Sequence, residues 1–194
     1  MNTPVRRFVC FVLLQGLGFS ACQAPPDPRR TNFTVTHPNL VAKYDPKTGR
    51  LSQIDADLDK NGRFESFTYW DGTHAIRAEV DTNDDGVIDR WEYYDDERRL
   101  IRLGASSRRD GKEDMWDLFD AQARVTASEH DDNRDGTVDK RQIYGPVSGE
   151  PDRRVIRISE LDIDASGQPG VRVYFREDGT QERMEILRLQ KPKA

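Results

Sequence analysis

The sequence predicts an all-β protein, an antiparallel β-hairpin repeat array with loops of EF-hand type between the hairpins. Glycine-centred loops recur along the chain with spacings of 24, 25, 25 and 31 residues, at Gly62, Gly86, Gly111, Gly136 and Gly167. Large and polar side chains alternate after each loop, which is the period of a β-strand. A second short run, rich in β-branched residues or alternating in polarity, follows a turn. We therefore expect about five units of about 25 residues, each consisting of loop, strand, turn and strand.

The first strand of each unit shows the period most clearly. Its two large positions lie eleven and thirteen places along the unit, at Phe67/Tyr69, Trp91/Tyr93, Trp116/Leu118, Arg141/Ile143 and Arg172/Tyr174. Stretches such as YDPKTG and FDAQAR have turn composition. The insertion GPVSGEP, residues 145–151, accounts for the longest spacing. A hairpin cannot bury its aromatic face alone, so neighbouring units must cover it, in one curved meander, two layers or a propeller.

The first 21 residues lie outside the repeats and predict a signal peptide. Arg6 and Arg7 precede FVCFVLLQGLGF, an apolar run of 12 residues. That length is too short for a membrane-spanning helix and fits the core of a secretory signal. FSAC, which ends at Cys22, resembles the lipobox of bacterial lipoproteins. The resemblance implies cleavage before Cys22 and lipidation of its thiol. A plain secretory signal and a signal anchor are the alternatives.

Cysteine usage agrees with lipidation. The chain has two cysteines, and Cys10 lies inside the apolar run. An exported chain would therefore keep Cys22 alone, as its first residue. Residues 22–32 form the lipidated cysteine and a Pro-rich tether, and 33–194 form the β-repeat domain. Gln23 stands where some bacteria use Asp to retain lipoproteins at the inner membrane, so the resemblance implies an outer-membrane anchor.

Three of the loops carry the oxygen spacing of a calcium loop. DTNDDGVIDRWE has oxygen-bearing residues at places one, three, five, nine and twelve, counted from Asp81, and Gly at place six. Its candidate ligands are Asp81, Asn83, Asp85, the carbonyl of Val87, Asp89 and Glu92. The 131 loop offers Asp131, Asn133, Asp135, the carbonyl of Thr137 and Asp139, and the 57 loop offers Asp57, Asp59, Asn61, the carbonyl of Arg63 and Glu65. Because a strand follows each loop, we expect place nine to matter more than Glu92.

These DxDxDG loops resemble those of EF-hand and dockerin-type repeats, which implies Ca²⁺ as the ligand. YDPKTGRL and YFREDGTQE resemble the Tyr-x-x-x-Gly hairpin repeats of exported bacterial proteins, including antitoxin-type repeats. Two loops depart from the pattern, with Ser106 and Arg108 at places one and three of one, and Ser166 and Gly170 at places five and nine of the other. The alternative is that all the loops are metal-free turns held by local hydrogen bonds.

Composition and motifs narrow the function. The net charge is −5 with both signs well mixed, so we expect no nucleic-acid partner. The sequence holds no GxSxG, HExxH or phosphate-binding glycine loop. We expect a non-catalytic, lipid-anchored calcium-binding module, with the membrane and a protein or glycan as partners. The alternatives are a helical EF-hand sensor, favoured by WEYYDDERRLIRLG at 91–104, and an enzyme or enzyme inhibitor with a groove on the sheet.

Overall fold

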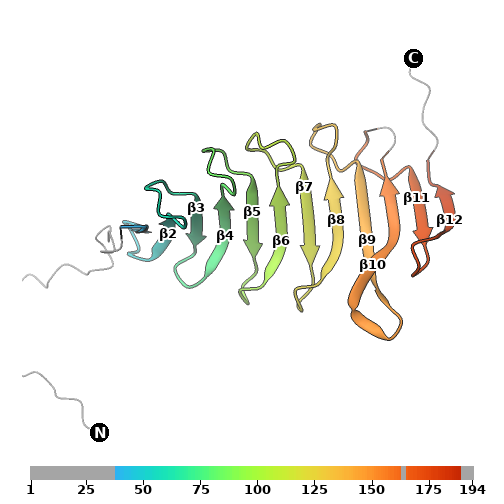
Figure 1. Ribbon diagram of the computed structural model, residues 1–194, viewed down its shortest axis with the longest axis horizontal. Helices are drawn as coiled ribbons and strands as arrows, with labels where there is room; N and C mark the ends of the chain where they lie inside the picture. The colour runs from blue at the N-terminus through green and yellow to red at the C-terminus, as the bar shows by residue number, and fades with distance from the viewer. Residues whose placement is uncertain (1–37, 163–164, 189–194) are drawn as a thin grey trace, which may run out of the picture.

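The computed structural model describes residues 38–162 and 165–188, which form one sheet of twelve antiparallel strands (Figure 1). The strand order in the sheet is the order in the sequence. The strands are β1 (Leu40–Tyr44), β2 (Leu51–Ala56), β3 (Ser66–Trp70), β4 (Ala75–Val80), β5 (Arg90–Tyr94), β6 (Leu100–Ala105), β7 (Met115–Phe119), β8 (Val125–His130), β9 (Lys140–Val147), β10 (Glu150–Leu161), β11 (Val171–Phe175) and β12 (Gln181–Ile186). The prediction of an all-β antiparallel array is confirmed, and a single meander is the arrangement that forms.

The helical alternative is wrong. Residues 91–104, where Asp, Glu and Arg pairs favoured a helix, belong to the β5–β6 hairpin. In this hairpin Trp91 is paired across the strands with Gly104, and Tyr93 with Arg102. No helix in the described part of the chain is long and apolar enough to cross a membrane. The predicted signal peptide (1–21) and the lipidated cysteine with its tether (22–32) lie outside the described residues.

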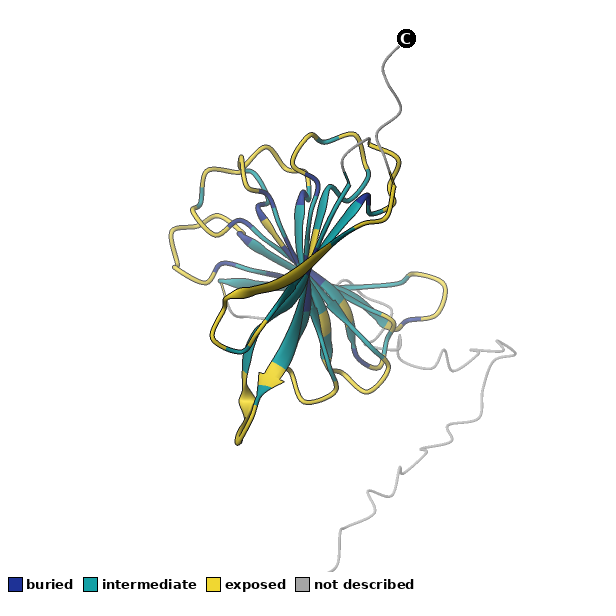
Figure 2. Cartoon of the chain, turned by 90° about the vertical axis from the view of Figure 1, so that its right-hand side faces the viewer, coloured by how far each residue is buried: buried dark blue, intermediate teal, exposed yellow. Residues whose placement is uncertain are grey.

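The sheet is a single twisted layer with little apolar core. Figure 2 looks along the row of strands, which rotate about a common axis while the connections fan outwards. Among the described apolar side chains only four are buried, on Ala42, Ala78, Trp91 and Ala127, whereas eleven polar or charged residues are buried. Seven of those eleven stand at place one or nine of a loop, namely Asp57, Glu65, Asp81, Asp89, Ser106, Asp114 and Asp131. The buried interior of this protein therefore consists largely of polar loop residues, whereas in most globular proteins it consists of apolar side chains.

A cross-strand set of tyrosine, arginine and glutamate occurs in the β3–β4 hairpin and again in the β11–β12 hairpin. The Tyr69 hydroxyl donates to Glu79 at 2.8 Å, and the Arg77 guanidinium lies 4.5 Å above the Tyr69 ring. Arg77 also pairs with Glu79 at 2.9 Å. Tyr174 makes the same contacts with Arg183 and Glu185 on β12. These cation–π and ion-pair contacts shield the aromatic rings without a second layer.

In the β5–β6 hairpin the glutamate of this set comes from a loop, because the strand position is Gly104. Arg102 lies over Tyr93, but the position two residues after Arg102 is Gly104 rather than glutamate. Glu113, from the β6–β7 loop, fills the space, and a Cβ on Gly104 would lie 2.8 Å from its carboxyl carbon. Glu113 accepts hydrogen bonds from the Tyr93 hydroxyl and from the Trp116 indole. Burial and this carboxylate raise the pKa of Tyr93 to about 12.

Four short turns on the edge opposite the long loops begin with an aspartate, at Asp45, Asp71, Asp95 and Asp120. Asp71 accepts hydrogen bonds from the Thr73 hydroxyl at 2.7 Å and from the backbone N–H of Thr73 at 2.8 Å. These bonds lower the pKa of Asp71 to about 2. The insertion at 145–151 does not form a loose loop, because it lengthens β9 and β10 into a hairpin that projects beyond this edge (Figure 1).

We predict that Gly104→Ala destabilises the protein by about 1 kcal/mol, because the new methyl displaces Glu113 from Tyr93 and Trp116. This loss is partly offset by the lower chain entropy of alanine. In a Glu113→Ala background the same change is expected to stabilise instead. Denaturant unfolding of the four chains measures both effects. An equal cost of Gly104→Ala in both backgrounds would contradict the role given to Glu113.

Candidate metal-binding loops

The long loops project from one edge of the sheet, the upper edge in Figure 1. They connect β2 to β3, β4 to β5, β6 to β7, β8 to β9 and β10 to β11, and are named here by their first residues, 57, 81, 106, 131 and 162. Residues 163 and 164 of the last loop are outside the described residues. Because each loop follows an even-numbered strand of a meander, the topology brings all of them to one side.

The loops share one backbone shape. Place six is a glycine with φ between 72° and 93° in every loop, at Gly62, Gly86, Gly111, Gly136 and Gly167. Place four is also left-handed although it is never glycine, with φ between 55° and 67° at Lys60, Asp84, Arg109, Arg134 and Ala165. A left-handed residue with a Cβ costs roughly 1–2 kcal/mol, so the surrounding loop must hold it in place. The two loops that depart from the calcium pattern keep this shape.

Hydrogen bonds to the place-one carboxylate close the turn. Asp57 accepts from the N–H of Gly62 at 2.9 Å, Asp81 from Gly86 at 2.6 Å, and Asp131 from Gly136 at 2.9 Å. Asp162 accepts in the same way from Gly167. In the 106 loop, place one is a serine instead of a carboxylate, and its hydroxyl accepts a hydrogen bond from the N–H of Asp110 at 3.1 Å.

Place five points into the same hollow. The carboxylate of Asp85 accepts from the N–H of Val87 at 2.9 Å, and Asp135 accepts from Thr137 at 2.9 Å. Hydrogen bonds from the Asn83 side chain and the Val87 backbone hold the pKa of Asp85 below its usual value. The hydroxyl and backbone of Thr137 lower the pKa of Asp135 in the same way. Both carboxylates are therefore ionised at neutral pH and available to a cation.

The hydrogen bonding of the place-nine carboxylate differs between the 57 loop and the 81 and 131 loops. In the 81 loop, Asp89 accepts from both the backbone and the hydroxyl of Thr82, at 3.0 Å and 2.8 Å. In the 131 loop, Asp139 accepts from the backbone and side chain of Asn133, both at 2.9 Å. Both carboxylate oxygens of Asp89 and of Asp139 are thus occupied by donors of their own loops.

Glu65 has one carboxylate oxygen that no donor reaches. Its Oε1 accepts from the backbone N–H groups of Leu58 and Asp59, but Leu58 has no side-chain donor for the second oxygen. Oε2 has no hydrogen-bond partner even though it is buried, and the whole residue is only 7% exposed. A buried carboxylate oxygen without a partner is costly unless a cation balances it.

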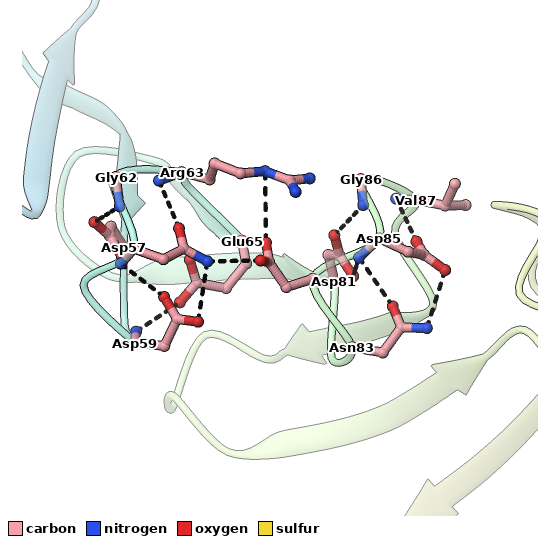
Figure 3. Close-up of polar contacts among 12 residues, drawn as sticks. Asp57, Asp59, Gly62, Arg63, Glu65, Asp81, Asn83, Asp85, Gly86 and Val87 are labelled. Carbon is pink, nitrogen blue, oxygen red and sulfur yellow. Dashed lines mark hydrogen bonds and ion pairs between the residues drawn. The ribbon is translucent and has the colours of Figure 1, made fainter.

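The 57 loop also brings its carboxylates together (Figure 3). Ligand oxygens of Asp57, Asp59 and Glu65 lie within 4.8 Å of one another, which is the one such group within the described residues. The amide oxygen of Asn61 faces the same turn and accepts from the N–H of Arg63 at 2.8 Å. These oxygens suit a hard divalent cation, which binds carboxylate, amide and carbonyl oxygens.

The predicted ligands of the other loops are only partly assembled. Asp81, Asn83 and Asp85 surround one turn, in which the Asn83 amide donates to Asp85 at 2.9 Å (Figure 3). The Oδ1 atom of Asp131 is buried without a hydrogen-bond partner, like the Oε2 atom of Glu65. Place seven follows the glycine in each loop, with its N–H bound to place five, at Arg63, Val87 and Thr137.

Glu92 does not join the 81 loop. It lies in β5, where it pairs with Arg90 at 2.6 Å and accepts a hydrogen bond from the Tyr94 hydroxyl. A strand begins directly after place nine, so place twelve is carried onto the face of the sheet. The candidate ligands of this loop are therefore limited to places one to nine, without Glu92.

Neighbouring loops touch through place four, a position that the ligand pattern ignores. Asp84 of the 81 loop accepts from the Asn61 side chain at 2.6 Å and lies 3.6 Å from the Arg63 guanidinium. Arg134 of the 131 loop reaches the 106 loop in the same direction. Sequence reasoning missed both contacts, because place four carries no regular charge pattern, with Lys60, Asp84, Arg109, Arg134 and Ala165 in the five loops.

Comparisons with known proteins give no family. No protein-family model and no curated protein matches the sequence. Ten chains of solved structures match, among them one titled "Crystal structure of GtfA/B complex bound to UDP and GlcNAc". That match has 7% sequence identity and a TM-score of 0.22, and it covers 70% of this chain and 22% of the other. The chain thus spans about a fifth of that protein's length, and a similarity at this level carries no argument about function.

Proposed function

We propose that this chain is an exported, lipid-anchored calcium-binding β-repeat protein that acts as a non-catalytic binding or scaffold module at the cell surface. The observation that carries the calcium proposal is the buried Oε2 of Glu65, which lacks a hydrogen-bond partner beside Asp57 and Asp59. The unpartnered Oδ1 of Asp131 supports a second site in the 131 loop. An enzymatic activity abolished by changing a carboxylate outside the loops would contradict the non-catalytic part of the proposal.

Calcium suits these loops better than magnesium. Ca²⁺ accepts roughly 6–8 oxygen ligands with flexible geometry, whereas Mg²⁺ requires a near-ideal octahedron and keeps its waters. The 57 loop would supply Asp57, Asp59, Asn61, the carbonyl of Arg63 and Glu65, with water completing the shell. Extracellular calcium modules bind with dissociation constants of about 10⁻⁴–10⁻³ M, which matches an exported protein.

Bound calcium would stabilise the connections that this thin sheet cannot stabilise by apolar burial. The loops join successive hairpins, and each holds more than one carboxylate. A cation that binds only the folded loop shifts the unfolding equilibrium by mass action. The sheet would then be stiffest where extracellular calcium is present, and loosened where it is scarce.

We predict that about 10 mM calcium raises the unfolding midpoint by roughly 4 °C for each occupied loop, relative to chelator. Glu65→Gln should reduce this rise, because it removes the charge of the unpartnered oxygen. Glu92→Gln is the matched control and should keep the full rise, since Glu92 is bound by Arg90 and Tyr94. Thermal unfolding followed by circular dichroism measures all three. A chain that does not respond to calcium would refute the calcium proposal, and an equal loss in both variants would refute the role of place nine.

We predict that Leu58→Thr weakens calcium binding at the 57 loop, because the new hydroxyl donates to Glu65 as Thr82 does to Asp89. Leu58 is 65% exposed, so the change should leave folding intact. Leu58→Val has the same shape without the donor and serves as the control. Calorimetric calcium titration should show a several-fold weaker site in the Thr variant alone. Identical affinities in the two variants would show that the free oxygen of Glu65 does not ligate the ion.

The lipid anchor rests on the sequence around Cys22 and has its own test. Cells that express the chain should incorporate a fatty-acid probe into it, and Cys22→Ala should abolish the label. Cys10→Ala is the control, because a cleaved signal would discard that residue. Labelling that survives Cys22→Ala, or that never occurs, would leave a plain secretory signal or a signal anchor.

A further inference from the structure

Arg134 extends from the 131 loop into the neighbouring 106 loop. Its guanidinium contacts Asp110 through Nη1 and Asp114 through Nη2 and Nε, with distances to Asp114 of 2.5 Å and 3.1 Å. The Asp114 side chain is 5% exposed and that of Arg134 is 20% exposed. The Arg134–Asp114 pair is therefore largely buried, and Asp110, whose side chain is 40% exposed, adds a second contact nearer the surface.

The two carboxylates that Arg134 binds stand at the ligand places of the loop. Asp110 and Asp114 occupy places five and nine of the 106 loop, the counterparts of Asp85 and Asp89 in the 81 loop. Places one and three of the 106 loop are Ser106 and Arg108, so these places bring no negative charge. The negative charge at the ligand places of this loop is thus two carboxylates, and the Arg134 guanidinium contacts both.

We infer that Arg134 is the built-in cation of the 106 loop: it takes the part that calcium would take in the 57, 81 and 131 loops and determines that the 106 loop binds no metal. The same contact clamps two neighbouring loops together. Burial alone would raise the pKa of Asp110 and of Asp114, but hydrogen bonds from Arg134 and from serines of the loop outweigh it and lower both.

The position of Arg134 also links this clamp to the 131 loop. It stands in the left-handed conformation, φ 62°, between Asn133 and Asp135, two predicted calcium ligands. A metal that orders those two residues would fix the backbone from which the guanidinium extends, and the clamp would in turn pre-order the loop for metal. This coupling, unlike the clamp itself, rests on the proposed calcium function, and it must act equally in both directions.

The test uses the full-length chain and begins in chelator, where calcium has no part. Arg134→Gln should lower the unfolding midpoint by about 5 °C or more, because it leaves the buried Asp114 carboxylate without a cation. Arg109→Gln is the matched control, since Arg109 stands at place four of its own loop with the same left-handed conformation. Its effect should be much smaller. Equal midpoints for the two variants would overturn the inference.

A double-mutant cycle makes the result independent of how well either variant folds. Asp114→Asn should destabilise the original chain, but should cost less or even restore stability when Arg134 is already Gln. Additive effects would overturn the clamp. If the clamp holds, calcium is added: Arg134→Gln should weaken calcium binding at the 131 loop several-fold and leave the 57 loop unchanged. A chain with a clamp and no calcium response would refute the proposed function while leaving the role of Arg134 intact, and unchanged affinity at the 131 loop would overturn the coupling.

Discussion

The negative charge buried along one edge of the sheet is the constraint on which the rest of the structure depends. A single layer cannot exclude water from both faces, and the carboxylates at places one and nine lie among its most buried groups. Such groups require donors or cations. Backbone N–H groups supply part of this need in each loop, and Arg134 supplies a cation to the 106 loop. Glu65 and Asp131 keep an oxygen that neither source reaches.

The same constraint explains how the units hold together. Each strand contacts its sequence neighbours, so an array of this kind is only as stable as the contacts between adjacent units. On the face of the sheet these are cross-strand sets such as Tyr69, Arg77 and Glu79. At the loop edge they are place-four contacts such as Asp84 to Asn61. An array of this kind can therefore be long and thin without a second layer of structure.

The sequence was sufficient for the parts of the fold that local periodicity determines. Alternation placed a strand over Trp91 and Tyr93, and the structure has β5 at Arg90–Tyr94. The shift of place twelve onto a strand also followed, because a strand has no room to turn Glu92 back. The partner of Asp114 could not be predicted, since Arg134 is 20 residues away and reaches it only through the stacking of loops. The free oxygen of Glu65 depends on the absence of a donor at Leu58, which a ligand pattern does not record.

Hydrogen exchange of the backbone amides, in calcium and in chelator, tests the central claim most directly. The account predicts that calcium slows exchange in residues 57–65, 81–89 and 131–139. It also predicts that residues 106–114 are already protected in chelator, because their cation is Arg134, and that the turns of the opposite edge do not change. Protection that is identical with and without calcium, or that rises equally at both edges of the sheet, would contradict the claim that cations at this edge stabilise the sheet.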